Sequence, residues 1–497
     1  MANLINEAEI RSTWAPIIEE ATGITESNKL AWMSEYCHNH KLYEDANIMS
    51  LAPTMNLAGM GAVTFPGATN TANVAGGGAN GSGDKAPTLL PLAMQVASQT
   101  IGLDLVPVIP MAGPMGLLSY LDYTYEGGRI DNTVTPTYVK ASGDGLALED
   151  ISTDPGTTPE VNGAELVGTS RIDGKNIYKI NAAGEAYVAA DATRSVADLF
   201  AVDSGDVTVE LVKAMEDHIP GFVGDVDADG NAKPFSRDVG ESTPDKLMGL
   251  SLFSKSVAAE TFQVAAAVTR EQVQDLKQFG VDAVAQVEAV LTNELTQSIN
   301  DYILKSMRTL AATNTTDNPF SGAIDLAPET NYGGETRGEA HRRILTNILA
   351  AANFIANKGR RGAGNFAVVD AKIASALQGI AGFVPNPMAN TFNQVAGAIY
   401  PVGSVAGINV YTDPRLPFNG GYLGDTAGDH RILVGRKGDG NGAGLVFMPY
   451  LMAESVQTIA EGTMAPKVAV KSRFALVEAG FHPETQYVEF KVKNVEL

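Results

Sequence analysis

The residues whose types and spacing most suggest a binding site are three aspartates at alternate positions in the sequence DVDADG. Asp225, Asp227 and Asp229 match the start of a calcium-binding loop, in which carboxylate oxygens coordinate a hard cation. The complete loop also needs an oxygen ligand at its ninth position and a glutamate at its twelfth, where this chain has Lys233 and Ser236. We therefore interpret the motif as an acidic surface turn. A cation site in a metal-binding protein or a metal-dependent hydrolase is the alternative.

The histidines and the single cysteine show no spacing typical of a metal site. The sequence CHNHK brings Cys37, His38 and His40 together, but zinc needs four ligands and no second cluster follows. We interpret these three as helix-surface residues. The remaining histidines are scattered at positions 218, 341, 430 and 482, and only folding could assemble a triad from them. The sequence thus predicts no catalytic, cofactor-binding or metal-binding residue.

Two glycine-rich stretches and two arginine pairs have residues that could bind phosphate. In GANGSGDK (78–85) an aspartate separates the last glycine from the lysine, and no strand precedes the loop. GRKGDGNGAG (435–444) has no helix after it, which excludes a dinucleotide site. The pairs at 342–343 and 360–361 would suit a phosphate, although salt bridges to acidic neighbours are the default expectation.

Composition narrows the class of protein. The chain has 497 residues and a formal net charge of −22, so it repels the phosphate backbone and disfavours sequence-independent nucleic-acid binding. One cysteine allows no intramolecular disulfide, which favours a reducing, cytosol-like compartment. The first residues lack the basic start and apolar core of a signal peptide, and no apolar run is long enough to span a membrane.

The first half of the chain consists of segments that favour helices, a glycine-rich segment and a segment that favours β-strands. Residues 1–50 favour amphipathic helices, with Leu30, Met33, Cys37 and Lys41 on one face. Residues 56–90 are rich in glycine, alanine and asparagine, as in a linker or an arm laid across another surface. The sequence GLLSYLDYTYEGG predicts a strand, and residues 130–236 predict a β-rich insertion.

The central region predicts a long helix. Thr269 and Gln272 have the form of a capping box for a short helix, and Asp282 can cap a longer one. In that longer helix apolar residues recur every three or four positions: Val284, Val287, Leu291, Leu295, Ile299 and Ile303. A strict heptad fails at Ser298, so we expect this stripe to be packed on its own domain rather than on a coiled-coil partner.

The second half predicts an α/β region and then terminal strands. A helix over GEAHRRILTNILAAANFIANKG precedes NFAVVD, which has the composition of a buried strand. Near the end, PKVAVKSRFALVEAG and YVEFKVKN alternate apolar and charged residues. If these two strands pair antiparallel, their opposite charges favour one register.

Read in order, several stretches resemble the major capsid protein of T-even-type tailed bacteriophages, which has the HK97-type fold. They are STWAPIIEEATGI, AAAVTREQVQDLKQFGVDAVAQVEAVLTNELTQSIN, ANKGRRGAGNFAVVDAKIASAL, GLVFMPYLM and APKVAVKSRFALVEAG. The resemblance implies an α+β fold. It implies an N-terminal arm (1–95), a peripheral or P domain (96–117, 255–345 and 443–497, with a spine helix at about 282–311), an extended loop carrying the insertion (118–254) and an axial or A domain (346–442).

The resemblance also implies a structural protein without enzymatic activity. Copies of the chain would self-assemble as hexamers and pentamers into an icosahedral head enclosing double-stranded DNA. The implied partners are scaffold, portal and decoration or vertex proteins, and packaged DNA contacted without sequence specificity, with no membrane. The implied location is the virion capsid, after assembly in the cytoplasm of a host bacterium.

One departure from the family concerns processing. Relatives are commonly trimmed near the N-terminus after a glutamate, and LINEA (Leu4–Ala8) is the only weak match here. We expect the arm to be retained. Mass spectrometry of assembled particles should find the intact arm, whereas a chain starting well inside it would contradict this prediction.

Overall fold

The structure is a computed structural model of the chain. It describes residues 7–22, 26–51, 96–97, 100, 102–125, 138–144, 146–148, 150–151, 161–171, 174–189, 196–201, 204–212, 225–226, 232–233, 248–279, 282–314, 318–320, 322–326, 337–385, 399–422, 425–426, 428–438, 442–459 and 465–495. The glycine-rich stretch 56–90 lies outside these residues.

The N-terminal region forms two helices, α1 (Glu7–Thr22) and α2 (Ser27–Leu51). Leu30, Met33 and Cys37 lie on the buried face of α2, as predicted, whereas Lys41 is exposed with its ammonium 6.0 Å from the centroid of the Trp14 ring. The interpretation of the CHNHK residues as helix-surface residues is wrong for Cys37 and His40, which are buried. His40 follows Cys37 by three positions and therefore shares its face of the helix.

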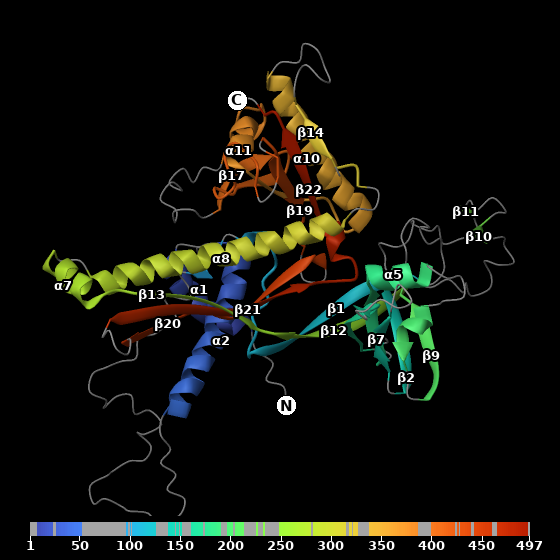
Figure 1. Ribbon diagram of the computed structural model, residues 1–497, viewed down its shortest axis with the longest axis horizontal. Coiled ribbons are helices and arrows are strands. Elements are labelled where there is room, and N and C mark those ends of the chain that lie inside the picture. The colour runs from blue at the N-terminus through green and yellow to red at the C-terminus, as the bar shows by residue number, and fades with distance from the viewer. Residues whose placement is uncertain are drawn as a thin grey trace, which may run out of the picture.

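The central helices begin where the sequence predicts. In α7 (Arg270–Gln278) the Thr269 side chain accepts a hydrogen bond from the Gln272 amide, and the Gln272 side chain accepts one from the Thr269 amide. In α8 (Ala283–Thr313) the Asp282 carboxylate accepts hydrogen bonds from two backbone amides of the first turn. Helix α8 has 31 residues and lies across the middle of the molecule (Figure 1). The predicted long helix is confirmed.

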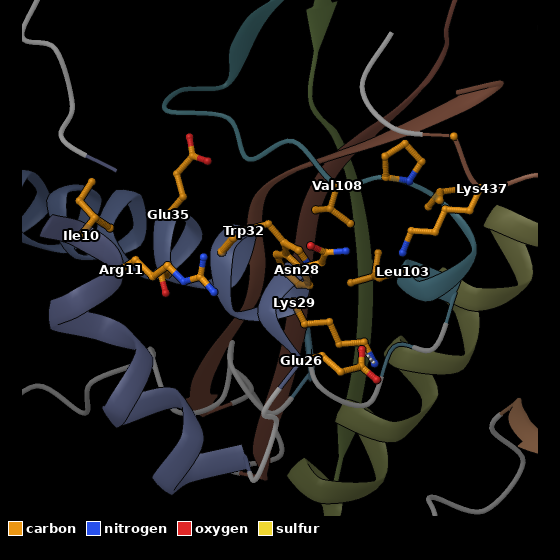
Figure 2. A pocket seen from close by; sticks show the side chains of 15 residues that line it. Ile10, Arg11, Glu26, Asn28, Lys29, Trp32, Glu35, Leu103, Val108 and Lys437 are labelled. Carbon is orange, nitrogen blue, oxygen red and sulfur yellow. Dashed lines mark ion pairs between the residues drawn. The ribbon is translucent and has the colours of Figure 1, made fainter. Parts of the chain in front are cut away.

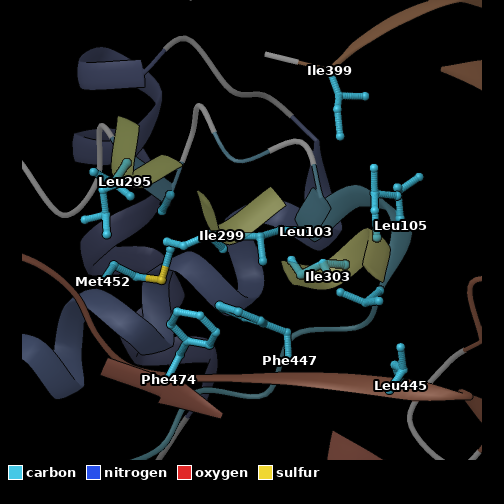
Figure 3. Close-up of a cluster of buried hydrophobic side chains, with 14 of the residues drawn as sticks. Leu103, Leu105, Leu295, Ile299, Ile303, Ile399, Leu445, Phe447, Met452 and Phe474 are labelled. Carbon is cyan, nitrogen blue, oxygen red and sulfur yellow. The ribbon is translucent and has the colours of Figure 1, made fainter. Parts of the chain in front are cut away.

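The predicted stripe of α8 faces a three-stranded antiparallel sheet. The sheet consists of β13 (Glu260–Ala267), β21 (Pro466–Glu478) and β20 (Leu445–Ile459), in that order. Leu295, Ile299 and Ile303 are fully buried in one cluster with Phe447, Met452 and Phe474 of the sheet (Figure 3). Burying each such side chain contributes about 1.5–3 kcal/mol, so the stripe stabilises the helix through packing rather than through local propensity.

A seven-stranded mixed sheet lies on the other side of α8 (Figure 1). Its strands, in spatial order, are β14 (Ala323–Asp325), β22 (Tyr487–Lys493), β19 (His430–Gly435), β15 (Phe366–Val369), β18 (Ile408–Thr412), β17 (Tyr400–Val405) and β16 (Phe383–Pro385). Strand β15 is buried along its whole length, as NFAVVD predicts. Helices α10 (Arg337–Gly359) and α11 (Ala371–Gln378) share the core of this sheet.

The two terminal strands do not pair with each other. Strand β21 lies between β13 and β20, whereas β22 lies between β14 and β19. A short 3₁₀ helix, η6 (Pro483–Gln486), connects the two sheets. The charged residues of these strands find partners elsewhere, since Lys471 Nζ lies 2.8 Å from Glu454 and Lys491 Nζ lies 2.6 Å from Asp425.

The predicted insertion is β-rich. A long antiparallel ribbon of β1 (Met115–Tyr125) and β12 (Met248–Ala258) leads from the body to a six-stranded sheet in the order β1-β12-β6-β7-β2-β9. The remaining elements are α4 (Gly102–Leu105), β2 (Tyr138–Asp144), β3 (Ala147–Leu148), β4 (Asp150–Ile151), β5 (Val161–Asn162), β6 (Ala164–Ser170), β7 (Asn176–Ile180), α5 (Ala182–Ala189), η3 (Val196–Leu199), β8 (Phe200–Ala201), β9 (Ser204–Leu211), β10 (Asp225–Val226) and β11 (Ala232–Lys233).

These elements confirm the α+β class. Helices and sheets are segregated around separate cores, one between α8 and the three-stranded sheet, one in the seven-stranded sheet and one in the insertion. Across the part of the chain that the structure describes, no helix has the length and apolar character needed to cross a membrane.

Candidate functional site

The sequence motif DVDADG is only partly described by the structure. Asp225 begins the short strand β10, and its backbone pairs in register with Lys233 of β11. Asp227 and Asp229 lie outside the described residues. Within the described ranges, no group of three or more His, Cys, Asp or Glu side chains is arranged to hold a metal ion.

One arrangement among the described residues that looks like part of a catalytic triad is a buried pair. His430 Nδ1 contacts Asp370 Oδ2, while Asp370 Oδ1 accepts a hydrogen bond of 2.8 Å from the Ile373 amide and so caps α11. Both side chains are 1% exposed, so no substrate can reach them. Burial also raises the pKa of the Cys37 thiol to about 12, which keeps it protonated and unreactive at neutral pH. Asp370 and His430 therefore have a structural role, as the cap of α11 and its buried partner.

The described residues hold helix α8, which we call the beam, on two sides. On one side α8 contacts the segment that precedes the β1 ribbon, where the Gly102 amide donates a hydrogen bond of 2.8 Å to Asn300 Oδ1. A Cβ on Gly102 would lie 2.8 Å from that oxygen and 3.0 Å from Ile303, so a larger residue there would displace these two side chains. Helix α2 is anchored nearby, because the Met452 amide donates a hydrogen bond of 2.8 Å to the Tyr36 hydroxyl.

On its other side, α8 meets the seven-stranded sheet through a half-buried ionic network, which we call the joint. Its members are Asp301, Arg308, Asp413, Arg415, Asp425, Arg431, Glu489 and Lys491. Arg308 is 9% exposed at its side chain and lies 3.4 Å from Glu489 and 4.0 Å from Asp413. Arg415 binds Asp413 through two hydrogen bonds and reaches Asp301 on α8 at 3.3 Å.

The pKa values of two acids in the joint are shifted by burial and by the neighbouring arginines. Burial raises the pKa of Glu489 despite the attraction of Arg431 and Arg308. The pKa of Asp425 is lowered, chiefly because Arg431 donates hydrogen bonds to it. The joint adds ionic contacts to the apolar packing of α8 against Phe366 and Leu433 of the seven-stranded sheet. Sequence reasoning missed it, because its members are spread from 301 to 491 and only the alternation of charge in β22 gave a signal.

The free end of the beam carries an exposed apolar surface. Helix α7 has no buried residue, and Leu276 and Phe279 at its end are 40% and 81% exposed. Val290 on α8 is 65% exposed, and Ile459 at the end of β20 is 74% exposed. Helix α7 and the end of β20 lie at the same end of the molecule (Figure 1). We call Leu276, Phe279, Val290 and Ile459 the end patch.

A second exposed apolar surface lies on the β1 ribbon and the neighbouring strand β6. Met115 and Leu117 point to the same side of β1 and are 74% and 53% exposed, and Leu166 of β6 is 49% exposed. We call these three residues the ribbon patch. Patches of this kind on a soluble protein mark sites of protein–protein contact. The described residues thus form a frame that exposes apolar side chains in two places and holds no group of side chains arranged to bind a metal ion.

The amino-acid sequence is similar to the major capsid proteins of several bacteriophages. The chain is 23% identical over 493 residues to the major capsid protein of Serratia phage KSP90, covering 97% of this chain and 92% of that protein. It is 25% identical over 247 residues to the major capsid protein of Salmonella phage ViI, covering 47% of this chain and 52% of that protein.

Solved structures show a weaker likeness. The chain is similar to a protein of Microbacterium phage Oxtober96, with a TM-score of 0.34 and 10% identity, covering 80% of this chain and 91% of that one. It is also similar to the mature capsid of bacteriophage PhiM1, with a TM-score of 0.31 and 11% identity, covering 50% and 75%.

The decisive match is to a family model. The model described as "Major capsid protein Gp23" matches residues 82–495, which is most of the chain. This family consists of structural proteins of the virion capsid, so the hydrolase alternative raised by DVDADG is wrong. The chain belongs to the family of the major capsid protein Gp23 and is a structural protein of a bacteriophage head, not an enzyme.

Proposed function

We propose that copies of this chain assemble as hexamers and pentamers into an icosahedral shell that encloses double-stranded DNA. The observation that carries the proposal is the end patch. An isolated helix of nine residues is marginal in water, and no residue of α7 is fully buried in its own chain, although Val273 is half-buried. A neighbouring copy that covers Phe279 would supply the burial that α7 lacks.

The proposed domains follow the HK97-type plan. The arm is 1–95, the extended loop is 118–254, the A domain is 346–442, and the P domain combines 96–117, 255–345 and 443–497. The beam and the three-stranded sheet support the P domain, and the ribbon with its insertion supports the extended loop. Strands β14 and β22 of the P-domain ranges lie in the sheet of the A domain, so the two domains share that sheet.

Two different contact surfaces suit a shell. A ring closes when one surface of each subunit binds a different surface of the next, as the end patch and the ribbon patch allow. Each contact can be of ordinary size, roughly 1,200–2,000 Å², because a subunit in a shell makes several of them. Weak individual contacts permit errors to be corrected during assembly, and their sum keeps the finished shell intact.

Further partners belong to the same proposal. A shell of this kind takes a scaffold during assembly, a portal at one vertex and decoration or vertex proteins outside. Assembly would occur in the cytoplasm of the host bacterium. The net charge of −22 favours solubility of the free chain at high concentration.

Phe279→Asp should prevent assembly and leave the fold intact. The side chain is 81% exposed, so the substitution costs about 0.5 kcal/mol or less in the free chain. In the shell it would place a charge in an apolar contact. Sedimentation velocity should show rings, sheets or shells for the natural chain and a monomer for the variant, with identical circular dichroism.

The matched control is Gln274→Asp, which adds the same charge to an exposed polar position of the same helix. This variant should assemble normally. Normal assembly of Phe279→Asp would show that the end patch is not a contact. A natural chain that stays monomeric at high concentration would overturn the proposed function itself.

A further inference from the structure

Strand β13 lies at one edge of the three-stranded sheet, beneath the α7 end of α8 (Figure 1). The Val268 amide, just after β13, donates a hydrogen bond of 3.1 Å to Pro466 of β21. The Ala259 amide, just before β13, donates one of 2.9 Å to Pro114 on the opposite side, next to β1. Because amides alternate in direction along a strand, the odd-numbered amides of β13 point away from β21. They belong to Thr261, Gln263, Ala265 and Ala267.

Within the described residues, no strand pairs with this outer edge of β13. The edge also lacks the features that protect edge strands in soluble proteins, because β13 (ETFQVAAA) contains no lysine, no proline and no bulge. Its only charge is at Glu260, and its odd-numbered side chains are exposed. The outward amides and carbonyls therefore form a template on which another strand can pair.

The opposite edge of the same sheet is covered along the first part of β20. Phe447 accepts a hydrogen bond of 2.9 Å from the Ile109 amide and donates one of 3.0 Å to the Pro107 carbonyl. Helix α2 contacts β20 just beyond this point, and Trp32 and Val108 border a cavity of about 690 Å³ on this side (Figure 2). The described residues therefore cover this part of the β20 edge and leave the edge at β13 open.

The open edge has the length and the ends that a second copy of β13 needs. It begins at Glu260, because β1 occupies the outer side of the preceding strand as far as Ala259. It ends at Ala267, because Thr269 caps α7 and the chain leaves the sheet there. An antiparallel copy of β13 would start and stop at the same places. In the register that sets Val264 opposite itself, all four outward-facing residues form hydrogen-bonded pairs.

The side chains of β13 suit this register. Gln263 would lie opposite Ala265 of the second copy, so a long side chain meets a short one. Glu260, the only charged residue of β13, would lie opposite Val268, so no like charges meet. The apolar side chains of both copies would stay on the face that α8 covers, where the ring of Phe262 packs.

We propose that β13 pairs antiparallel with β13 of a second copy of this chain across a two-fold axis, so that two three-stranded sheets become one. This contact is isologous, whereas the end patch and the ribbon patch would join unlike surfaces. An isologous contact cannot close a ring of that kind and would instead join one ring to the next. In that role the inference rests on the proposed function. A single short edge is a weak contact, so the pairing accumulates in particles, where many copies are held together.

Cysteine cross-linking of the full-length chain tests the register. The only natural cysteine, Cys37, is fully buried, so a new one reports its own surroundings. Val264→Cys would place two Cα atoms about 4.5 Å apart, which a disulfide can bridge. Thr261→Cys is the matched control, because its own copy would lie about 20 Å away. A mild oxidant should link Val264→Cys, but not Thr261→Cys, into covalent dimers, in particles and more slowly in a concentrated Phe279→Asp background that lacks the ring contact.

Hydrogen exchange resolved to single amides measures the pairing without a substitution. In the unassembled chain the odd-numbered amides of β13 should exchange fast, and in particles about tenfold or more slowly. The even-numbered amides bind β21 and should be protected in both states. Ala265→Pro removes an outward amide and leaves the bonds to β21 in place, so it should give rings but no closed shells. Ala265→Val keeps the amide and should assemble like the natural chain.

Three results would overturn the inference. The first is equal cross-linking of Val264→Cys and Thr261→Cys, which would reflect random collision. The second is fast exchange of the odd-numbered amides in particles. The third is their protection in the unassembled chain, since another segment of the same chain would then occupy the edge. Sedimentation reports assembly separately, so normal shells together with any of these results would leave the proposed function standing.

Discussion

Leu295→Asp should abolish folding of the chain. Leu295 is fully buried between α8 and the three-stranded sheet, in the cluster that contains Met452 and Phe474 (Figure 3). An aspartate there would be an unpaired charge in an apolar core, which costs more than about 4 kcal/mol. Since the free energy of unfolding of a domain is only about 5–15 kcal/mol, this loss removes a large part of it. Thermal unfolding followed by circular dichroism should show no cooperative transition.

Val290→Asp provides the contrast on the same helix. Val290 is 65% exposed, so the same change should alter stability by no more than about 0.5 kcal/mol. A soluble, normally assembling Leu295→Asp chain would show that the buried face of α8 has been assigned wrongly. Equal damage from both substitutions would mean that burial of Leu295 is not the cause.

Arg308→Met should destabilise the chain by about 3 kcal/mol, because it leaves the buried carboxylates of Glu489 and Asp413 with fewer partners. Both acids keep a second arginine, Arg431 or Arg415, so the loss is smaller than for an isolated pair. Chemical denaturation measures the change. Adding Glu489→Gln to Arg308→Met should recover part of it, since the buried carboxylate that lost one of its two arginine partners is then neutral.

Lys305→Met is the control for the joint. Lys305 pairs with Asp301 at 2.8 Å on the same helix, but its side chain is 56% exposed. Exposed pairs of this kind contribute about 0.5 kcal/mol or less. If Arg308→Met were as mild as Lys305→Met, the joint would contribute little to the attachment of α8 to the seven-stranded sheet.

Local signals in the sequence predicted the beam accurately. The capping box at Thr269 and the cap at Asp282 are confirmed to the residue, because each depends on side chains within three positions. The stripe from Leu291 to Ile303 is confirmed because burial of one helix face leaves a period of 3.6.

Contacts between distant segments could not be predicted in the same way. The alternation in β21 and β22 predicted two strands but not their partners, and each strand joins a different sheet. After Phe474 the buried positions of β21 change to the other face, because Ala475 and Val477 are buried in a second core that the alternation did not indicate. The joint and the end patch each combine residues that only the fold brings together.

The most direct test of the account is a cryo-electron microscopy reconstruction of particles formed by the purified chain. It should show closed or sheet-like arrays of subunits, with α8 unbroken from Ala283 to Thr313 and Phe279 covered by a neighbouring copy. A broken or displaced α8, or arrays in which α7 stays exposed to solvent, would contradict the claim that this helix braces the contacts between copies.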